Sequence, residues 1–316
     1  MKKWLLTLGM AVVLTACGAA DDQESAEESG AEGEQGQQEE AAPSSDEVFE
    51  IAVIPSQSIG EMQTGLDKLE AHLSEQLNRE VSVEHYPNYN AVVEALNYNN
   101  IDLAYLGPLT YLIAHEQSGA QAIVTQLIDG EPYYYSYIIT HKDSEWEDLD
   151  DLLEDRSEVD FAFASISSTS GHLIPGLELR NRGVYESENE HEFNQLQFTG
   201  SHDLVTTLVQ DQTVDAGAVD SAILEALMKE DEQNGGTLRD DIKVLWQSEQ
   251  LYQYPWVVPA QTDDELIAQI QEAFLSIDDE EIFQVFGGAS GFVVADDSQY
   301  ADVLEAAREF DMLTLE

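Results

Sequence analysis

Basic residues and cysteine are scarce in this 316-residue chain, and each shortage excludes a class of protein. Only 12 lysines and arginines stand against 64 aspartates and glutamates, which gives a formal charge of −52 at pH 7. A nucleic-acid partner requires a basic surface, so we expect no DNA- or RNA-binding role. The 7 histidines and the single cysteine lack the spacing of metal ligands, and we expect neither a metal site nor another cofactor.

The only cysteine, Cys17, follows a segment that is typical of protein export. Lys2 and Lys3 precede an apolar run, Trp4–Leu14, which is too short to span a bilayer as a stable helix. The sequence Leu14-Thr15-Ala16-Cys17 resembles the lipobox of bacterial lipoproteins, in which the cysteine is acylated and becomes the new N-terminus. The alternative is an ordinary cleavable signal, although an unpaired thiol is unusual in a secreted protein. We therefore predict a signal peptide over residues 1–16 and a lipid anchor on Cys17, outside the cytoplasm.

The segment after Cys17 has the composition of a disordered chain. Glu, Gln, Ser, Gly and Ala dominate it as far as Asp46, and it contains no aromatic residue. Such a segment cannot bury enough apolar surface to offset the entropy of ordering, so residues 17–47 are predicted to form a flexible acidic tether. The rest of the chain is long enough for two lobes of ordinary size. It contains no second apolar run of membrane length.

Strand and helix patterns alternate over the first part of this region. Phe49–Ile54 is a short β-rich run, and Met62–Leu77 then carries leucines at helical spacing. The alternation predicts an α/β fold with a mostly parallel sheet. The following strand, helix, strand and helix are predicted at Val81–His85, Ala91–Tyr98, Ile101–Tyr105 and Leu109–His115.

The apolar and aromatic segment Tyr133–Thr140 changes this rhythm, and a second alternating block runs from Asp160 to Trp246. Tyr254–Val258 then resembles a return strand, and two further helices are predicted over 263–276 and 300–310. The simplest architecture is two α/β lobes joined by two crossing strands, with a ligand cleft that closes by hinge motion. We predict lobe 1 over residues 48–138 and 254–316, and lobe 2 over residues 139–253.

Acidic residues occur on most predicted helices and in runs such as Glu225–Glu232 and Asp278–Glu281. These runs are typical of solvated faces on a protein adapted to salty surroundings. In molar salt the Debye length falls to about 3 Å, so such a surface repels itself little.

A small polar loop, Ser165–Gly171, follows the predicted strand that ends at Ala164. Unpaired backbone N–H groups and the helix dipole face such a loop, which makes it a suitable anion site. The hydroxyls of Ser168, Thr169 and Ser170 add donors without adding charge. The alternative is that Ser170 or Thr169 only caps the helix.

Several segments together resemble the phosphonate-, phosphite- and phosphate-binding lipoproteins of ABC transporters, a family of two-lobed, type II periplasmic binding proteins. The resemblance runs from about Phe49 to Phe310 and depends on the order and spacing of the segments. They are Tyr89–Leu96, Asp102–Pro108, Tyr134–Ser136 with Lys142–Ser144, Ser168–Gly171, Gly200–Asp203 and Val214–Asp220.

The resemblance implies that the hydroxyls of residues 168–170 hold an oxyanion, with Tyr134 and His202 completing the cage from the facing side. It also implies that Tyr89 reaches the ligand from the other lobe. His202, with an ordinary pKa of about 6.5, can be neutral or charged, and its alternative role is to cap the helix that begins near Asp203.

Asp220 ends a predicted strand, where the ligand clefts of α/β lobes open. A buried carboxyl there would favour a protonated oxyanion; the alternatives are a helix cap or a surface acid. Family members that bind an aminoalkyl phosphonate are thought to place acids near the positions of Ala222 and Tyr254, which are uncharged here. The resemblance therefore favours phosphite, phosphate or methylphosphonate over aminoethylphosphonate.

The function that the resemblance implies is an extracytoplasmic, monomeric solute-binding lipoprotein that delivers a phosphorus oxyanion to the permease of an ABC transporter. Alternatives are a binding protein for another small anion or organic solute, and a ligand-sensing subunit for a membrane kinase. An enzyme would use Ser168 or Ser170 as nucleophile and His202 as base. We expect no enzyme, because the chain has neither a Gly-x-Ser-x-Gly elbow nor a Ser-x-x-Lys pair.

Overall fold

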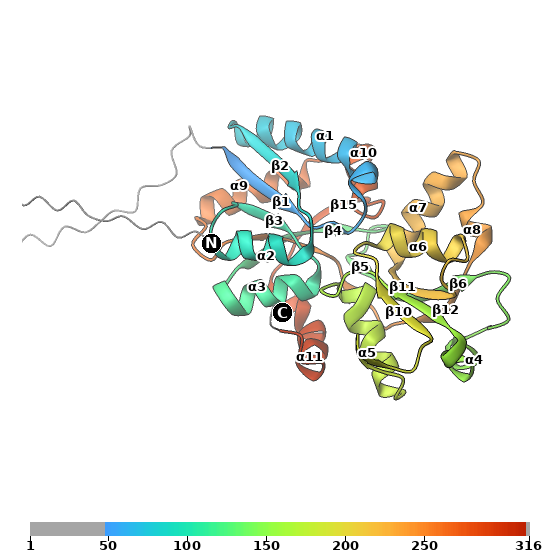
Figure 1. Cartoon of the computed structure of the whole chain (residues 1–316). Coiled ribbons are helices and arrows are strands. Elements are labelled where there is room, and N and C mark those ends of the chain that lie inside the picture. The colour runs from blue at the N-terminus through green and yellow to red at the C-terminus, as the bar shows by residue number, and fades with distance from the viewer. Residues whose placement is uncertain (1–47, 314–316) are drawn as a thin grey trace, which may run out of the picture. The chain divides into compact units, whose positions relative to one another are not determined.

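A computed structural model describes residues 48–313 of the chain, and Figure 1 shows its helices and strands. The predicted signal peptide, the lipid anchor on Cys17 and the acidic tether lie outside the described residues. The fold class is α/β, as predicted, with two main sheets that each carry helices.

The first sheet contains strands from both ends of the described chain, and its order is β15-β4-β14-β3-β1-β2. Helix α1 packs against α9 and α10, whereas α3 packs against α2 and α11, and Figure 1 shows these two groups on opposite sides of the sheet. The strands are β1 (Phe49–Val53), β2 (Val81–His85), β3 (Leu103–Tyr105), β4 (Gln121–Leu127), β14 (Pro255–Val258) and β15 (Gly291–Val294). The helices are α1 (Ile59–Leu77), α2 (Tyr89–Asn97), α3 (Pro108–Ser118), α9 (Asp264–Leu275), α10 (Glu280–Val285) and α11 (Ala301–Glu309).

The second sheet comes from the middle of the chain, in the order β10-β7-β11-β6-β12. Its strands are β6 (Ser136–His141), β7 (Asp160–Phe163), β10 (Gln195–Phe198), β11 (Ala216–Asp220) and β12 (Ile242–Gln247). Its helices are α4 (Leu149–Glu154), α5 (Ile174–Asn181), α6 (His202–Gln210), α7 (Ser221–Gln233) and α8 (Leu238–Asp241), and a hairpin of β8 (Tyr185–Ser187) and β9 (Glu190–His191) follows α5.

The chain passes from the first sheet to the second after β4 and returns after β12. Two short strands lie on these passages, β5 (Tyr133–Tyr134) and β13 (Leu251–Tyr252), and they pair with each other in antiparallel register. Lobe 1 denotes the first sheet with its helices, and lobe 2 denotes the second sheet with its helices.

The prediction of mostly parallel sheets is wrong, because both sheets are mixed. β1 is parallel to β2 and β3, and β7 is parallel to β10 and β11, as the strand–helix–strand alternation requires. The strands next to the two passages run the other way: β14 is antiparallel to β3 and β4, and β6 to β11 and β12. A chain that leaves a sheet and returns to it can insert antiparallel strands without a crossover helix.

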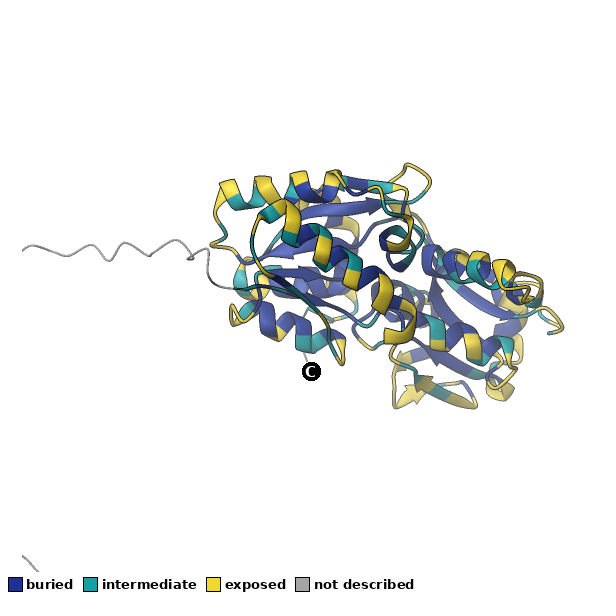
Figure 2. Ribbon diagram, turned by 90° about the horizontal axis from the view of Figure 1, so that it is seen from above, coloured by how far each residue is buried: buried dark blue, intermediate teal, exposed yellow. Residues whose placement is uncertain are grey.

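The interior of each lobe is apolar, and Figure 2 shows buried sheets beneath helices whose outer sides are exposed. The leucine stripe predicted for α1 is oriented inward, since Leu66, Leu69 and Leu73 are buried. Over residues 48–313, no helix combines the length and apolarity needed to cross a membrane.

Candidate anion-binding site

The turn predicted to bind an anion follows β7. It is already helical, so the helix starts earlier in the chain than the sequence suggests. A π-helical turn, η2 (Thr169–Leu173), precedes α5, and Ser168 is its N-cap. The Ser168 Oγ accepts a hydrogen bond of 3.0 Å from the Gly171 N–H. The cap is therefore Ser168, and the alternative that Ser170 or Thr169 caps the helix is wrong.

Gly171 allows this turn to lie against its neighbours. A Cβ at this position would lie 2.5 Å from the Ala164 Cβ and 2.9 Å from the His202 Cε1. Real Cβ atoms do not approach so closely, so a side chain here would push the turn away from His202.

Helix N-termini, including the N-cap Ser168, contribute most of the seven predicted site residues. Tyr89 is the first residue of α2, Thr169 of η2 and His202 of α6, and Asp220 is the N-cap of α7. The first N–H groups of a helix have no partner within the helix, and the dipole places a partial positive charge there. These helix ends can attract an anion without a basic side chain.

Three of the predicted residues carry buried hydroxyls that make no hydrogen bond of good geometry with another described residue, although they lie close to one another and to the Ser168 hydroxyl: Tyr89 Oη, Tyr134 Oη and Ser170 Oγ. The side chains are 1%, 1% and 0% exposed. Burial raises the pKa of both phenols, so they stay protonated and can donate. Leaving a buried hydroxyl unpaired costs about 1–3 kcal/mol, and three such groups in one cluster fit a ligand with several acceptor oxygens.

His202 is buried, and its surroundings fix its tautomer. The Asp220 N–H donates to the His202 Nδ1 at 3.1 Å, so Nδ1 carries no hydrogen. In the neutral ring the hydrogen therefore lies on Nε2, which is 3.4 Å from the Ser168 Oγ and 3.3 Å from the Tyr254 Oη. Burial lowers the pKa of His202 to about 4, so near neutral pH this residue is an uncharged donor.

His202 does not approach the turn from the other lobe. Helix α6 packs on β11, in the same lobe as the turn, and His202 lies beside Ser168. Nor does its side chain cap α6, whose N-cap is Ser201. Tyr134 lies on the crossing strand β5, and Tyr89 comes from α2 of lobe 1, the other lobe, as the resemblance implied.

Asp220 is a helix cap that also borders the site. Its Oδ1 accepts from the Ala222 N–H at 2.7 Å and from the Ile223 N–H at 3.1 Å. Burial raises the pKa of Asp220 to about 7, although these N–H groups and the nearby hydroxyls of Tyr254 and Ser170 oppose the rise. The carboxyl is buried, so the alternative of a surface acid is wrong.

The site lies where the two lobes touch. The Thr169 Oγ1 accepts from the Leu109 N–H of α3 at 2.8 Å, and the His202 N–H donates to the Ser56 carbonyl at 3.0 Å. The Ser167 Oγ donates to the Asn90 Oδ1 at 2.7 Å. The structure is therefore a closed form. Ser56 and Leu109 were not predicted; their positions just beyond β1 and at the start of α3 are the signal that could have indicated them.

A small cavity borders the site at Asp220. Ala222, Gln126, Gln253 and Tyr254 are among its other lining residues, and its volume of about 10 Å³ corresponds to about one water molecule. Among the described residues that line it, the carboxyl of Asp220 is the only charged group.

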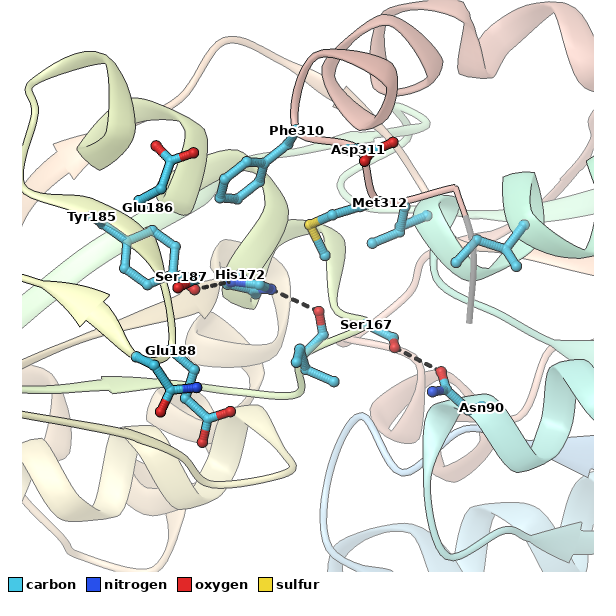
Figure 3. Close-up of a pocket in the computed structure, with 14 residues that line it drawn as sticks. Asn90, Ser167, His172, Tyr185, Glu186, Ser187, Glu188, Phe310, Asp311 and Met312 are labelled. Atoms are coloured by element: carbon cyan, nitrogen blue, oxygen red, sulfur yellow. Dashed lines mark hydrogen bonds between the residues drawn. The ribbon is translucent and has the colours of Figure 1, made fainter. Parts of the chain in front are cut away.

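A larger cavity, about 280 Å³ in volume, lies on the outer side of the turn, between His172 and Tyr185 on one side and Asn90 on the other (Figure 3). None of the seven predicted residues lines it. The carboxylates of Glu186, Glu188 and Asp311 do line it, and they would repel an anion. The hydroxyl cluster is therefore the better candidate for an anion site.

Within residues 48–313, no cluster of histidine and acidic side chains could hold a metal ion. The described ion pairs of lysine and arginine involve none of the seven predicted residues. The site therefore offers an anion only hydroxyl, imidazole and backbone donors, together with one carboxyl that can hold a proton.

Comparison with known proteins places these features in a family. The profile of "ABC transporter, phosphonate, periplasmic substrate-binding protein" matches residues 51–300. The probable ABC transporter phosphite binding protein PhnD1 of Prochlorococcus marinus is 25% identical over 282 residues, which are 85% of this chain and 92% of that protein. The phosphate-import protein PhnD of Mycolicibacterium smegmatis is 27% identical over 212 residues, 65% of this chain and 64% of that protein.

A solved structure supports the fold assignment. PhnD1 of Prochlorococcus marinus in complex with methylphosphonate has a TM-score of 0.72 and 24% identity to this chain, with 84% of this chain and 98% of that chain covered. Since the family profile spans most of the described residues, the chain belongs to the periplasmic substrate-binding proteins of phosphonate ABC transporters.

Proposed function

We propose that this protein captures a small phosphorus oxyanion (phosphite, phosphate or methylphosphonate) and delivers it to an ABC permease for import. The observation that carries the proposal is the set of buried hydroxyls on Tyr89, Tyr134 and Ser170 that make no hydrogen bond of good geometry with another described residue. The Nε2–H of His202 and the Thr169 hydroxyl lie in the same cluster. Tetrahedral anions present several acceptor oxygens, which is what a cluster of donors requires.

The size of the site favours a small substituent on phosphorus. The cavity beside Asp220 has room for about one water molecule in the closed form, so it would accommodate a hydrogen, a hydroxyl or a methyl group. Ala222 and Tyr254, near which a clamp for an amine would require acids, line this cavity without charge.

One observation favours a second candidate, an aminoalkyl phosphonate. Asp220 lines the small cavity and could pair with an ammonium group. This candidate requires the cavity to enlarge, and it predicts that Asp220→Asn abolishes binding of the amine ligand.

Asp220 also suits a protonated oxyanion. Because burial raises the pKa of Asp220 to about 7, the carboxyl can hold a proton and donate it in a hydrogen bond to a ligand oxygen. A monoanion that keeps its own proton could instead donate to the ionised carboxylate. Either arrangement places one shared proton between two oxygens, whereas two ionised groups in contact would repel each other.

Binding without catalysis is part of the proposal. The Ser168 Oγ and the His202 Nε2 are 3.4 Å apart, which superficially resembles a nucleophile and its base. Because Nδ1 of His202 accepts from a backbone N–H, Nε2 already carries the hydrogen and cannot take one from Ser168.

We further propose a monomer that is held at the membrane by a lipid on Cys17, with residues 17–47 as its tether. This location fits a family that works outside the cytoplasm beside a permease. Mass spectrometry of the protein from membranes would show diacylglycerol on an N-terminal Cys17; a mature chain that retains no lipid and starts elsewhere would overturn the anchor.

Calorimetric titration of the purified protein with phosphite, phosphate, methylphosphonate, aminoethylphosphonate and sulfate tests the ligand class. We expect one or more of the three amine-free phosphorus oxyanions to bind most tightly and sulfate to bind weakly. If an unrelated solute binds and no phosphorus oxyanion does, the proposal is wrong. Permease and ATPase genes beside this gene would support transport, and a histidine kinase gene would support sensing.

A further inference from the structure

His172 is a buried histidine outside the proposed ligand cluster, and it makes two short hydrogen bonds (Figure 3). Its Nδ1 lies 2.7 Å from the Ile166 carbonyl oxygen, and its Nε2 lies 2.7 Å from the Tyr185 Oη. A carbonyl can only accept, so Nδ1 carries the hydrogen. Nε2 then accepts the hydrogen bond that the Tyr185 hydroxyl donates.

The ring of His172 is held firmly by aromatic neighbours. The rings of Phe163 and Phe198 each lie with their centroids 4.9 Å from that of His172, at angles close to perpendicular. Burial lowers the pKa of His172 to about 4, so the ring is neutral and its two nitrogens keep these distinct roles near neutral pH.

The partner of His172 belongs to the segment that leads into the anion-binding turn. Ile166 lies two residues before Ser168, and its side chain is 43% exposed, so apolar packing does little to hold it. The next residue, Ser167, donates to Asn90 of lobe 1. The hydrogen bond from His172 to the Ile166 carbonyl therefore fixes one end of a turn whose other residues contact lobe 1 and the proposed ligand.

The C-terminal end of α11 covers this arrangement from the direction of lobe 1. The Phe310 ring has its centroid 5.9 Å from that of His172 and 6.0 Å from that of Tyr185. The Arg180 guanidinium lies 5.2 Å from the Phe310 ring, and its Nη1 donates to the Glu309 carbonyl at 3.2 Å. These contacts exclude water from one side of the histidine.

We propose that His172 is a positioning residue for the anion site, and that the relay from Tyr185 through His172 to the Ile166 carbonyl sets the position of residues 166–170. The inference rests on the proposed function, because it assumes that the hydroxyls of residues 168–170 hold the ligand. His172 itself does not contact the ligand in this proposal.

Three variants separate the hydrogen bond from simple packing. His172→Leu removes both bonds, Tyr185→Phe removes only the donor to Nε2, and His172→Asn keeps a side-chain N–H near the position of Nδ1. We expect the dissociation constants for phosphite and methylphosphonate to rise about tenfold in His172→Leu and about threefold in Tyr185→Phe. His172→Asn should recover most of the loss.

Hydrogen exchange of the backbone amides of residues 166–170 provides a second readout that needs no ligand. We expect faster exchange in His172→Leu and Tyr185→Phe than in the wild type, while amides of the first sheet stay unchanged. The inference is overturned if both variants keep wild-type exchange in this segment, or if His172→Asn resembles His172→Leu in affinity and exchange.

The two proposals fail differently. If the wild type binds none of phosphite, phosphate and methylphosphonate, the proposed function is wrong, and the exchange rates still decide whether the hydrogen bonds of His172 hold the turn. If the wild type binds and all three variants bind equally well with unchanged exchange, the function stands and the positioning role is wrong. Should His172→Leu fail to fold, Tyr185→Phe and His172→Asn still provide the comparison.

Discussion

The exterior of the described chain carries many ionised side chains, whereas the proposed site contains almost none. Outside, acids crowd the surface, and most of the described lysines and arginines pair with them, as Arg239 does with Glu225 and Glu232. Inside, seven predicted residues include one carboxyl, that of Asp220, and burial raises its pKa to about 7. Exposed pairs of this kind contribute about 0–1 kcal/mol each, whereas unpaired buried donors cost more.

This difference indicates how an anion could bind to a strongly acidic protein. The long-range field of the surface repels anions, so attraction has to come from donors at hydrogen-bond distance and from helix N-termini. Such interactions act over a few ångströms and depend on the geometry of the closed form. Substitutions in the site, changes of pH and added salt each test this division between surface and site.

Thr169→Val should have the largest effect on affinity. It removes a hydroxyl donor from the ligand cluster. It also leaves the Leu109 N–H, which donates a hydrogen bond of 2.8 Å to the Thr169 Oγ1, without that partner in the closed form. We expect the dissociation constant for phosphite or methylphosphonate, measured by calorimetry, to rise about a hundredfold or more.

Thr140→Val is the matched control, because the Thr140 hydroxyl is also buried and donates to the Asp215 carbonyl at 2.7 Å, within lobe 2. It should lower the melting temperature and leave affinity unchanged. Equal losses of affinity in the two variants would mean that Thr169 acts only through stability.

Ser170→Ala should weaken binding about tenfold or somewhat more, since it removes one hydrogen bond to a charged ligand. The Ser170 Oγ makes no hydrogen bond of good geometry with another described residue, so the melting temperature of the ligand-free protein should stay the same or rise. A large loss of stability without a loss of affinity would remove Ser170 from the site.

Asp220→Asn should change how binding depends on pH. Where Asp220 supplies the shared proton, its pKa of about 7 means that binding above that pH requires the carboxyl to take up a proton, and the affinity of the wild type should fall about tenfold between pH 6 and pH 8. Asparagine keeps the helix cap and does not ionise. Ionisation of the ligand is common to both proteins, so the ratio of their affinities isolates Asp220; a ratio that is constant with pH would contradict this role.

For the same substitution, Asp220→Asn, the sign of the change in unfolding free energy with pH can be predicted. The pKa of Asp220 is raised in the folded state from its ordinary value of 3.8, so its contribution to stability is fully present below about pH 4 and is lost as the pH rises to about 7. Urea unfolding should therefore show the variant gaining stability relative to the wild type across that range.

Salt should have the smallest effect, and its sign is informative. Raising the salt concentration from 0.1 M to 1 M shortens the Debye length from about 10 Å to 3 Å and screens the repulsive surface. We expect affinity for the anion to rise about twofold to fivefold with sodium gluconate. A steep loss of affinity with salt would indicate that basic side chains hold the ligand.

The sequence predicted the βαβ part of the fold well because each of its elements carries a local pattern. The strand Val81–His85 and the leucine stripe of α1 were predicted as they occur. Strand β4 and the hairpin β8–β9 were not predicted, because their residues mix apolar and polar types without clear alternation. The parallel order of the sheets was overestimated, since pairing between distant segments leaves no local pattern.

The sequence indicated which residues form the candidate site, but not how their side chains are arranged. A strand followed by hydroxyl residues and a helix indicated residues 168–170, and the family resemblance supplied Tyr89, Tyr134 and His202. The tautomer of His202 depends on the Asp220 N–H, and the contact of Thr169 with Leu109 joins the two lobes. Both depend on residues that are distant in sequence, so no spacing could reveal them.

Whether uncharged donors hold the anion is tested most directly by a crystal structure of the protein with phosphite or methylphosphonate bound. We predict ligand oxygens within about 3.2 Å of the Ser170 Oγ, the hydroxyls of Tyr89 and Tyr134 and the His202 Nε2, with no lysine or arginine in contact. A ligand bound in the cavity beside Tyr185, or held by a basic side chain, would contradict the account.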